Sequence, residues 1–159
     1  MIKFIDRIGA EIREGNLLLL RQNDQGAFLG YAKTVKHTLC FCYSSLYESS
    51  IGIIELKDIN PNDITVLNIA EFNERIGKSQ ENRWVRYYDK NGIALAEGMV
   101  IYFGSEESGN ELLIIKDKNE LKVKSGETTN LPLYGVMLSA DNYKDDVILD
   151  FIPNKYLDF

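Results

Sequence analysis

The segment that decides the fold is NLLLLRQ, residues 16–22, which is followed by the turn residues NDQG and by a second apolar segment from Ala27 to Val35. Turn residues between two apolar segments are typical of a β-hairpin. The four leucines do not alternate with polar residues, so the pattern predicts a strand that is covered on both faces. The sequence therefore predicts a sheet with further structure packed on both sides of this strand.

Short apolar segments recur about every ten residues along most of the chain, which is typical of strands joined by turns. They occupy residues 39–43, 51–56, 64–67, 83–88, 93–103, 112–115, 121–124, 133–138 and 147–152. The clearest turn lies at residues 89–92, where Asn91-Gly92 favours a tight connection. The pattern predicts a mostly β fold: an antiparallel sandwich or distorted barrel of about ten short strands with one or two short helices.

Two segments show helical spacing instead. Isoleucine recurs on one helical stripe of residues 1–14, although the segment from Met1 to Ile5 is also compatible with a strand. Residues 69–76 have the same spacing, with Asn68 in the N-cap position and Gly77 as the expected end. The sequence therefore predicts a helix at each place, and it leaves the strand open as an alternative at the N-terminus.

The chain of 159 residues is long enough for a full hydrophobic core, and we predict a single domain over residues 1–159. No fixed-period repeat and no interdomain linker is apparent. The N-terminal apolar run is broken at Asp6 and Arg7, which is unlike a signal peptide, and no apolar run is long enough to span a membrane. A cytoplasmic location is therefore expected.

The charge of the chain is negative and unevenly distributed. The formal net charge is −6, which argues against nucleic acid or an anionic membrane as the main partner. Residues 1–104 carry 12 Lys+Arg against 13 Asp+Glu, whereas residues 105–159 carry 6 against 11. The chain is either an acidic protein without a dedicated surface, or its C-terminal third presents an acidic face to a basic partner.

The soft metal ligands are few. His37, Cys40 and Cys42 form one cluster, but no second histidine or third cysteine exists to complete a zinc site. On a strand the two cysteines point to the same face, which favours buried structural thiols over a disulfide. We expect no metal and no cofactor.

Catalytic residues are equally hard to identify. Glu97 is the best single candidate for a buried acid, but without a second carboxylate it is better explained as an outward-facing side chain. A cluster of cationic and aromatic residues predicts a strand with a tryptophan in the core, a protein interface or, against the negative net charge, a nucleic-acid contact. It comprises Arg83, Trp84, Arg86, Tyr87 and Tyr88. We therefore expect a protein that is not an enzyme.

These observations favour a non-enzymatic protein that binds and neutralises another protein. A small acidic chain without catalytic motifs fits an immunity protein or antitoxin-like inhibitor that occludes a basic bacterial toxin such as a nuclease. The predicted partner contacts are acidic, with Tyr143 as an aromatic anchor: Glu106, Glu107, Asp141, Asp145, Asp146 and Asp150.

Two alternatives remain open. The nine tyrosines and seven phenylalanines can line the interior of a β-barrel that binds a small ligand and is possibly an enzyme. The chain can also be a structural subunit of a phage or secretion assembly. The sequence does not determine the oligomeric state.

Overall fold

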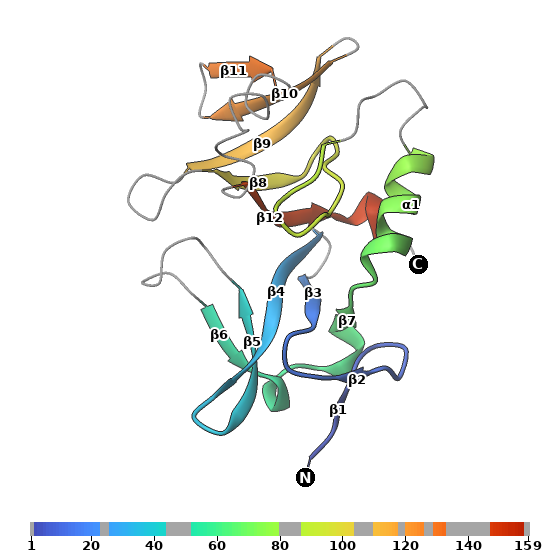
Figure 1. The fold of residues 1–159 in the computed structure, drawn as a ribbon, viewed down its shortest axis with the longest axis vertical. Helices are drawn as coiled ribbons and strands as arrows, with labels where there is room; N and C mark the ends of the chain where they lie inside the picture. The colour runs from blue at the N-terminus through green and yellow to red at the C-terminus, as the bar shows by residue number, and fades with distance from the viewer. Residues whose placement is uncertain are drawn as a thin grey trace.

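The computed structural model describes residues 2–22, 26–43, 52–79, 87–103, 110–117, 120–125, 129–132 and 147–157. Within these residues it contains twelve strands and one α-helix. Ten strands form one antiparallel sheet, which curls into a half-barrel, and two form a small hairpin (Figure 1). The predicted mostly β, antiparallel fold is confirmed.

The small hairpin consists of β1 (Phe4–Ile5) and β2 (Glu11–Ile12). The strands of the large sheet are β3 (Leu17–Gln22), β4 (Gly26–Val35), β5 (Thr38–Tyr43), β6 (Gly52–Glu55), β7 (Ile64–Val66), β8 (Val100–Phe103), β9 (Asn110–Asp117), β10 (Glu120–Ser125), β11 (Thr129–Pro132) and β12 (Val147–Pro153). The helix α1 spans Ile69–Ser79, and 3-10 turns occupy Leu56–Asp58, Pro61–Asp63 and Asn154–Tyr156. The predicted segments 83–86 and 133–138 lie outside the described residues.

The predicted N-terminal helix is wrong, and the strand alternative is confirmed for Phe4–Ile5. Phe4 pairs with Ile12 in the β1–β2 hairpin. The side chain of Asp6 accepts hydrogen bonds from the N–H groups of Ile8 at 3.0 Å and Ala10 at 2.8 Å. An aspartate that binds the backbone two and four residues further on favours a turn over a helix.

Three other boundaries differ from the sequence prediction. The predicted strand 93–103 is confirmed only from Val100, because the preceding residues make turns and a single bridge, Tyr88↔Ala94. The helix α1 has its predicted N-cap, since Asn68 Oδ1 accepts the N–H of Glu71 at 3.1 Å, but it continues beyond Gly77. The strand β11 (Thr129–Pro132) was not among the predicted apolar segments.

The large sheet consists of two units with the same strand order. In the first unit the neighbours run β7-β3-β4-β5-β6, and in the second they run β12-β8-β9-β10-β11. The two units occupy the lower and upper parts of Figure 1. They share one sheet because Phe151–Pro153 of β12 pairs with Gly26–Phe28 of β4.

The units also begin with the same turn. Asp89 Oδ1 accepts the N–H groups of Asn91 and Ile93, both at 2.9 Å, as Asp6 does in the first unit. The second carboxylate oxygen of each aspartate accepts an N–H from the last strand of its own unit: Val66 at 2.9 Å for Asp6, and Leu149 at 3.1 Å for Asp89. Each carboxylate therefore connects the opening turn of its unit to the last strand of the same unit.

The repeat is faint in the sequence. The segment FIDRIG, residues 4–9, corresponds to YYDKNG, residues 87–92, and Glu14-Gly15 corresponds to Glu97-Gly98 at the same offset of 83 positions. Gly9 and Gly92 have φ of 88° and 82°, a conformation that favours glycine. The sequence shows no fixed-period repeat because few positions retain identical residues, and the two units are recognised from their strand order.

The hydrophobic residues form two clusters. The first lies inside the first unit and contains Leu18 and Leu20 of β3 together with Phe41. The second fills the second unit and extends between the units, where it includes Leu19 of β3 and Phe72 of α1. Consecutive leucines thus enter different clusters, which confirms that this strand is covered on both faces.

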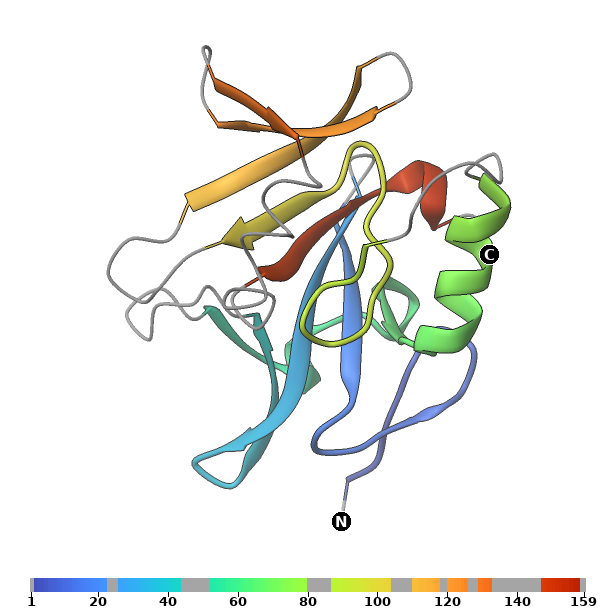
Figure 2. The same cartoon turned by 45° about the horizontal axis from the view of Figure 1, so that its top comes forward.

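Polar side chains fix α1 and β4 against the opening turn of the second unit. The amide of Asn73 on α1 donates to the carbonyl of Gly92 at 2.8 Å and accepts the N–H of Ala94 at 2.7 Å. The hydroxyl of Tyr31 on β4 donates to Asn91 Oδ1. Figure 2 shows the segment before β8, which contains this turn, running beside α1. In the described part of the chain, no helix is long and apolar enough to cross a membrane.

We predict that Asp89→Ala lowers the free energy of unfolding by about 2–4 kcal/mol, because three backbone N–H groups lose their acceptor. Asp6→Ala should have a similar effect. The control is Asp117→Ala, which removes an exposed ion pair with Lys122 and should cost at most about 1 kcal/mol. Urea unfolding followed by circular dichroism measures all three, and equal stability of the Asp89 and Asp117 variants would contradict the proposed role of the turn.

Candidate functional site

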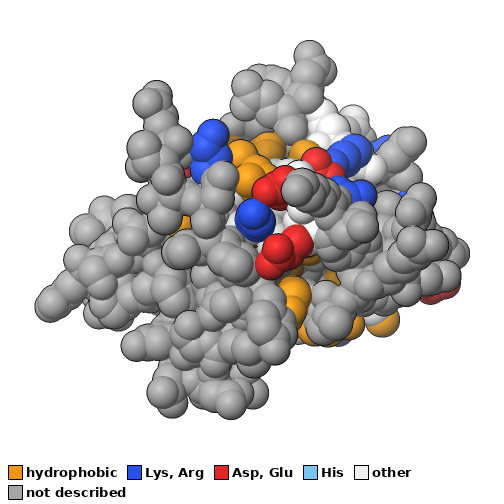
Figure 3. All heavy atoms as spheres, turned by 90° about the horizontal axis from the view of Figure 1, so that it is seen from above, with side chains coloured by type: hydrophobic (Ala, Val, Ile, Leu, Met, Phe, Trp, Pro, Cys, Tyr) orange, Lys and Arg blue, Asp and Glu red, His pale blue; other side chains and the backbone are white. Residues whose placement is uncertain are grey.

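The structure places one of the seven predicted partner contacts. Glu106, Glu107, Asp141, Tyr143, Asp145 and Asp146 lie outside the described residues, and Asp150 lies on β12. The described residues beyond position 104 carry four acidic and four basic side chains, so the acidic excess of this region lies outside them. Figure 3 shows acidic and basic side chains interspersed with hydrophobic ones at this end of the molecule.

Asp150 occupies an irregular position in the sheet. The register between β12 and β8 shifts between Leu149 and Phe151, which leaves Asp150 as a bulged residue. Burial, together with the negative charge of Glu111 on β9, raises the pKa of Asp150 to about 6. A half-buried carboxylate beside another acid is electrostatically unfavourable, and a cation placed next to it relieves that repulsion.

The other candidate residues show no catalytic arrangement. Cys40 and Cys42 are buried and not disulfide-bonded, as predicted, and burial raises the pKa of both thiols. His37 is exposed in the two-residue turn between β4 and β5. Glu97 is also exposed, as the outward-facing interpretation predicted, and its backbone carbonyl accepts the hydroxyl of Tyr156 at 2.7 Å.

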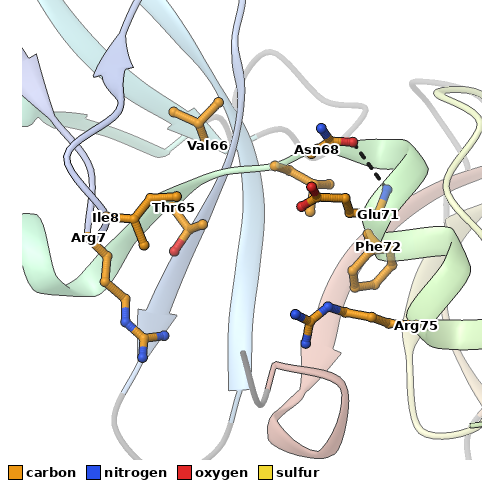
Figure 4. A pocket seen from close by; sticks show the side chains of 9 residues that line it. Arg7, Ile8, Thr65, Val66, Asn68, Glu71, Phe72 and Arg75 are labelled. Carbon is orange, nitrogen blue, oxygen red and sulfur yellow. Dashed lines mark hydrogen bonds between the residues drawn. The ribbon is translucent and has the colours of Figure 1, made fainter.

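Sequence reasoning missed a cavity between α1 and the β1–β2 turn. Its volume is about 270 Å³, and it combines charged, polar and apolar side chains (Figure 4). Its lining consists of Arg7, Ile8, Thr65, Val66, Leu67, Asn68, Glu71, Phe72 and Arg75. In Figure 4 the two guanidinium groups reach in from opposite sides, Arg7 from the turn and Arg75 from α1.

Thr65 is the unusual member of this lining. Its side chain is 6% exposed, and its hydroxyl has no hydrogen-bond partner among the described residues. Thr65 pairs with Leu19 across β3 and β7, so both side chains lie on the sheet face that carries α1. A buried hydroxyl without a partner costs free energy, and a functional site is a common reason for keeping one.

The same turn that fastens the first unit also positions Arg7. The N–H of Arg7 donates to the carbonyl of Ile64 at 2.9 Å, immediately beside the bond between Asp6 and Val66. Arg7 therefore emerges from a backbone held against the outer edge of β7. Asn68 caps the first turn of α1, which places Glu71 and Arg75 one helical turn apart on the cavity side.

We predict that Thr65→Val raises the free energy of unfolding by about 1 kcal/mol, because valine has nearly the same shape and no hydroxyl to leave unpaired. Thr34→Val, at an exposed position on β4, is the matched control and should change stability much less. Thermal and urea unfolding measure both. A destabilised Thr65→Val protein would show that the hydroxyl is satisfied in solution.

We predict that Asp150→Asn changes the free energy of unfolding by an amount that depends on pH. Because the folded pKa is raised from 3.8 to about 6, the charged carboxylate disfavours folding near neutral pH, and this cost disappears as the pH falls below about 4. The substitution should therefore raise the free energy of unfolding near pH 7 by about 1–2 kcal/mol and have little effect at acidic pH. Urea unfolding of the wild type and the variant at several pH values between about 4 and 7 tests this prediction. A difference in the free energy of unfolding that does not change with pH would contradict the assigned pKa.

Comparison with known proteins identifies no relative of this chain. No protein-family model, curated protein or solved structure matches the chain. The function must therefore be argued from the residues themselves.

Proposed function

We propose that this protein binds another protein without catalysing a reaction, as an inhibitor of the immunity or antitoxin type that neutralises a basic bacterial toxin such as a nuclease. A cytoplasmic location is part of the proposal. The observation that carries it is the charge imbalance of residues 105–159, with 6 Lys+Arg against 11 Asp+Glu. An acidic surface of this kind attracts a basic partner and speeds the encounter.

The environment of Asp150 supports the proposal from the described part of the chain. Its carboxylate lies near that of Glu111 and has a raised pKa. A lysine or arginine of a partner would lower this pKa by replacing repulsion with attraction. The free protein thus carries a local electrostatic cost that a basic partner removes.

The proposal is tested by charge reversal. The double variant Asp145→Lys/Asp146→Lys should weaken capture of the partner by about tenfold or more at physiological ionic strength, mainly through slower association. The tagged protein is used to capture partners from the lysate of its own source at low and high salt, with the bound proteins identified by mass spectrometry. The affinity of the main partner is then measured for each variant.

The matched control is Asp58→Lys/Asp63→Lys, which reverses two exposed acidic residues in the first unit. It should leave partner affinity nearly unchanged. Equal weakening by both double variants would indicate a general effect of net charge, and an unchanged affinity for Asp145→Lys/Asp146→Lys would refute the acidic-face proposal. Capture of a partner whose binding does not depend on salt would count against it as well.

A further inference from the structure

We infer that the cavity between α1 and the β1–β2 turn is a binding site for a small molecule that carries one carboxylate on an apolar body. The inference does not depend on the proposed partner, because the cavity is lined by residues between positions 7 and 75, whereas the acidic excess lies beyond position 104 in the sequence. It rests on four features of the cavity lining: two guanidinium groups, the hydroxyl of Thr65 that has no described partner, the charged groups, and the apolar side chains.

The polar groups match an oxyanion. Arg7 lines the cavity from the β1–β2 turn, Arg75 lines it from α1, and Thr65 lines it from β7 (Figure 4). Guanidinium groups bind carboxylates with charge-assisted, often paired, hydrogen bonds. A guanidinium has five N–H donors, so either arginine can bind an oxyanion while it keeps other contacts. An oxyanion would also accept the hydrogen bond that the hydroxyl of Thr65 lacks.

The charge of the lining favours a monoanion. The charged side chains that line the cavity are two cationic groups, Arg7 and Arg75, and one anionic group, Glu71. A single carboxylate is attracted by the two guanidinium groups. A phosphate monoester near neutral pH carries up to two negative charges, and Glu71 would oppose the second one.

The rest of the cavity suits an apolar substituent. Phe72 and Leu67 belong to the hydrophobic core between the units, and both line the cavity together with Ile8. A volume of about 270 Å³ is slightly below the range of sites for drug-sized ligands, so the cavity fits a small compound. Ligand sites of this type combine an apolar lining with a few polar groups that fix the orientation.

The first unit alone carries this combination. Position 90, which corresponds to Arg7, is lysine, and position 148, which corresponds to Thr65, is isoleucine. The last strand of the first unit leads into α1, which supplies Arg75, whereas β12 leads into a short 3-10 turn. The cavity is therefore a feature added to one copy of the repeated unit.

The test is a titration of the full-length ¹⁵N-labelled protein with three probes: benzoate, inorganic phosphate and benzylamine, which has the same ring with the opposite charge. Benzoate should shift the amide resonances of residues 7–8, 65–67 and 71–75, and benzylamine should not. Arg7→Gln and Arg75→Gln should each weaken benzoate binding by about tenfold. Arg13→Gln, which changes an exposed arginine that follows β2 and does not line the cavity, should leave benzoate binding unchanged.

Thr65→Val keeps the test decisive if an arginine variant is unstable, because it should weaken benzoate binding while the protein stays at least as stable as the wild type. Shifts at these residues with phosphate but not with benzoate would overturn the carboxylate assignment. No saturable shifts with benzoate up to about 10 mM would overturn the site itself. Equal binding of benzoate and benzylamine would also overturn it, since the arginines would then play no part.

Discussion

The fold depends on one interaction that occurs twice, a buried aspartate whose carboxylate accepts three backbone N–H groups. In each unit one oxygen organises the opening turn and the other binds the last strand, 60 residues further along the chain. Both aspartates are among the few buried charged residues in the described part of the chain, at 2% and 5% exposure. Burial raises the pKa of Asp89, and the backbone donors oppose that rise. Three charge-assisted bonds offset the cost of removing the carboxylate from water.

The two units differ in the elements that follow their last strands. The first unit ends in α1, whose Asn73 and Phe72 bind and pack against the second unit. The side of the helix toward the β1–β2 turn instead lines the cavity with Arg75 and Glu71. The helix therefore both packs against the second unit and lines the cavity beside the β1–β2 turn. The region beyond position 104 contributes most of the acidic excess and none of this lining.

The sequence predicted the strands well, because burial on one or both faces leaves a direct pattern of apolar residues. The leucine run of β3 is an example. The N-cap at Asn68 was also predicted, from the local signal of a polar residue before a segment with helical spacing. The N-terminal helix failed because spacing alone does not show a shared face: Ile8 is 79% exposed, whereas Ile12 is buried. The cavity was not predictable in this way. Its residues come from a turn, a strand and a helix, and an unpaired hydroxyl is recognised only when its neighbours are known.

The equal spacing of the two aspartate contacts has a consequence for how the chain folds. Both closures join segments 60 residues apart, so they carry similar loop-closure entropy. The pairing of β4 with β12 joins segments roughly twice as far apart, which adds about 0.6 kcal/mol to that entropic cost. Residues 89–149 lie inside that longer loop, so the contact between Asp89 and Leu149 shortens the stretch of chain that the pairing of β4 with β12 must still close. The continuous sheet thus contains two chain closures of equal length, one of them nested within a longer third.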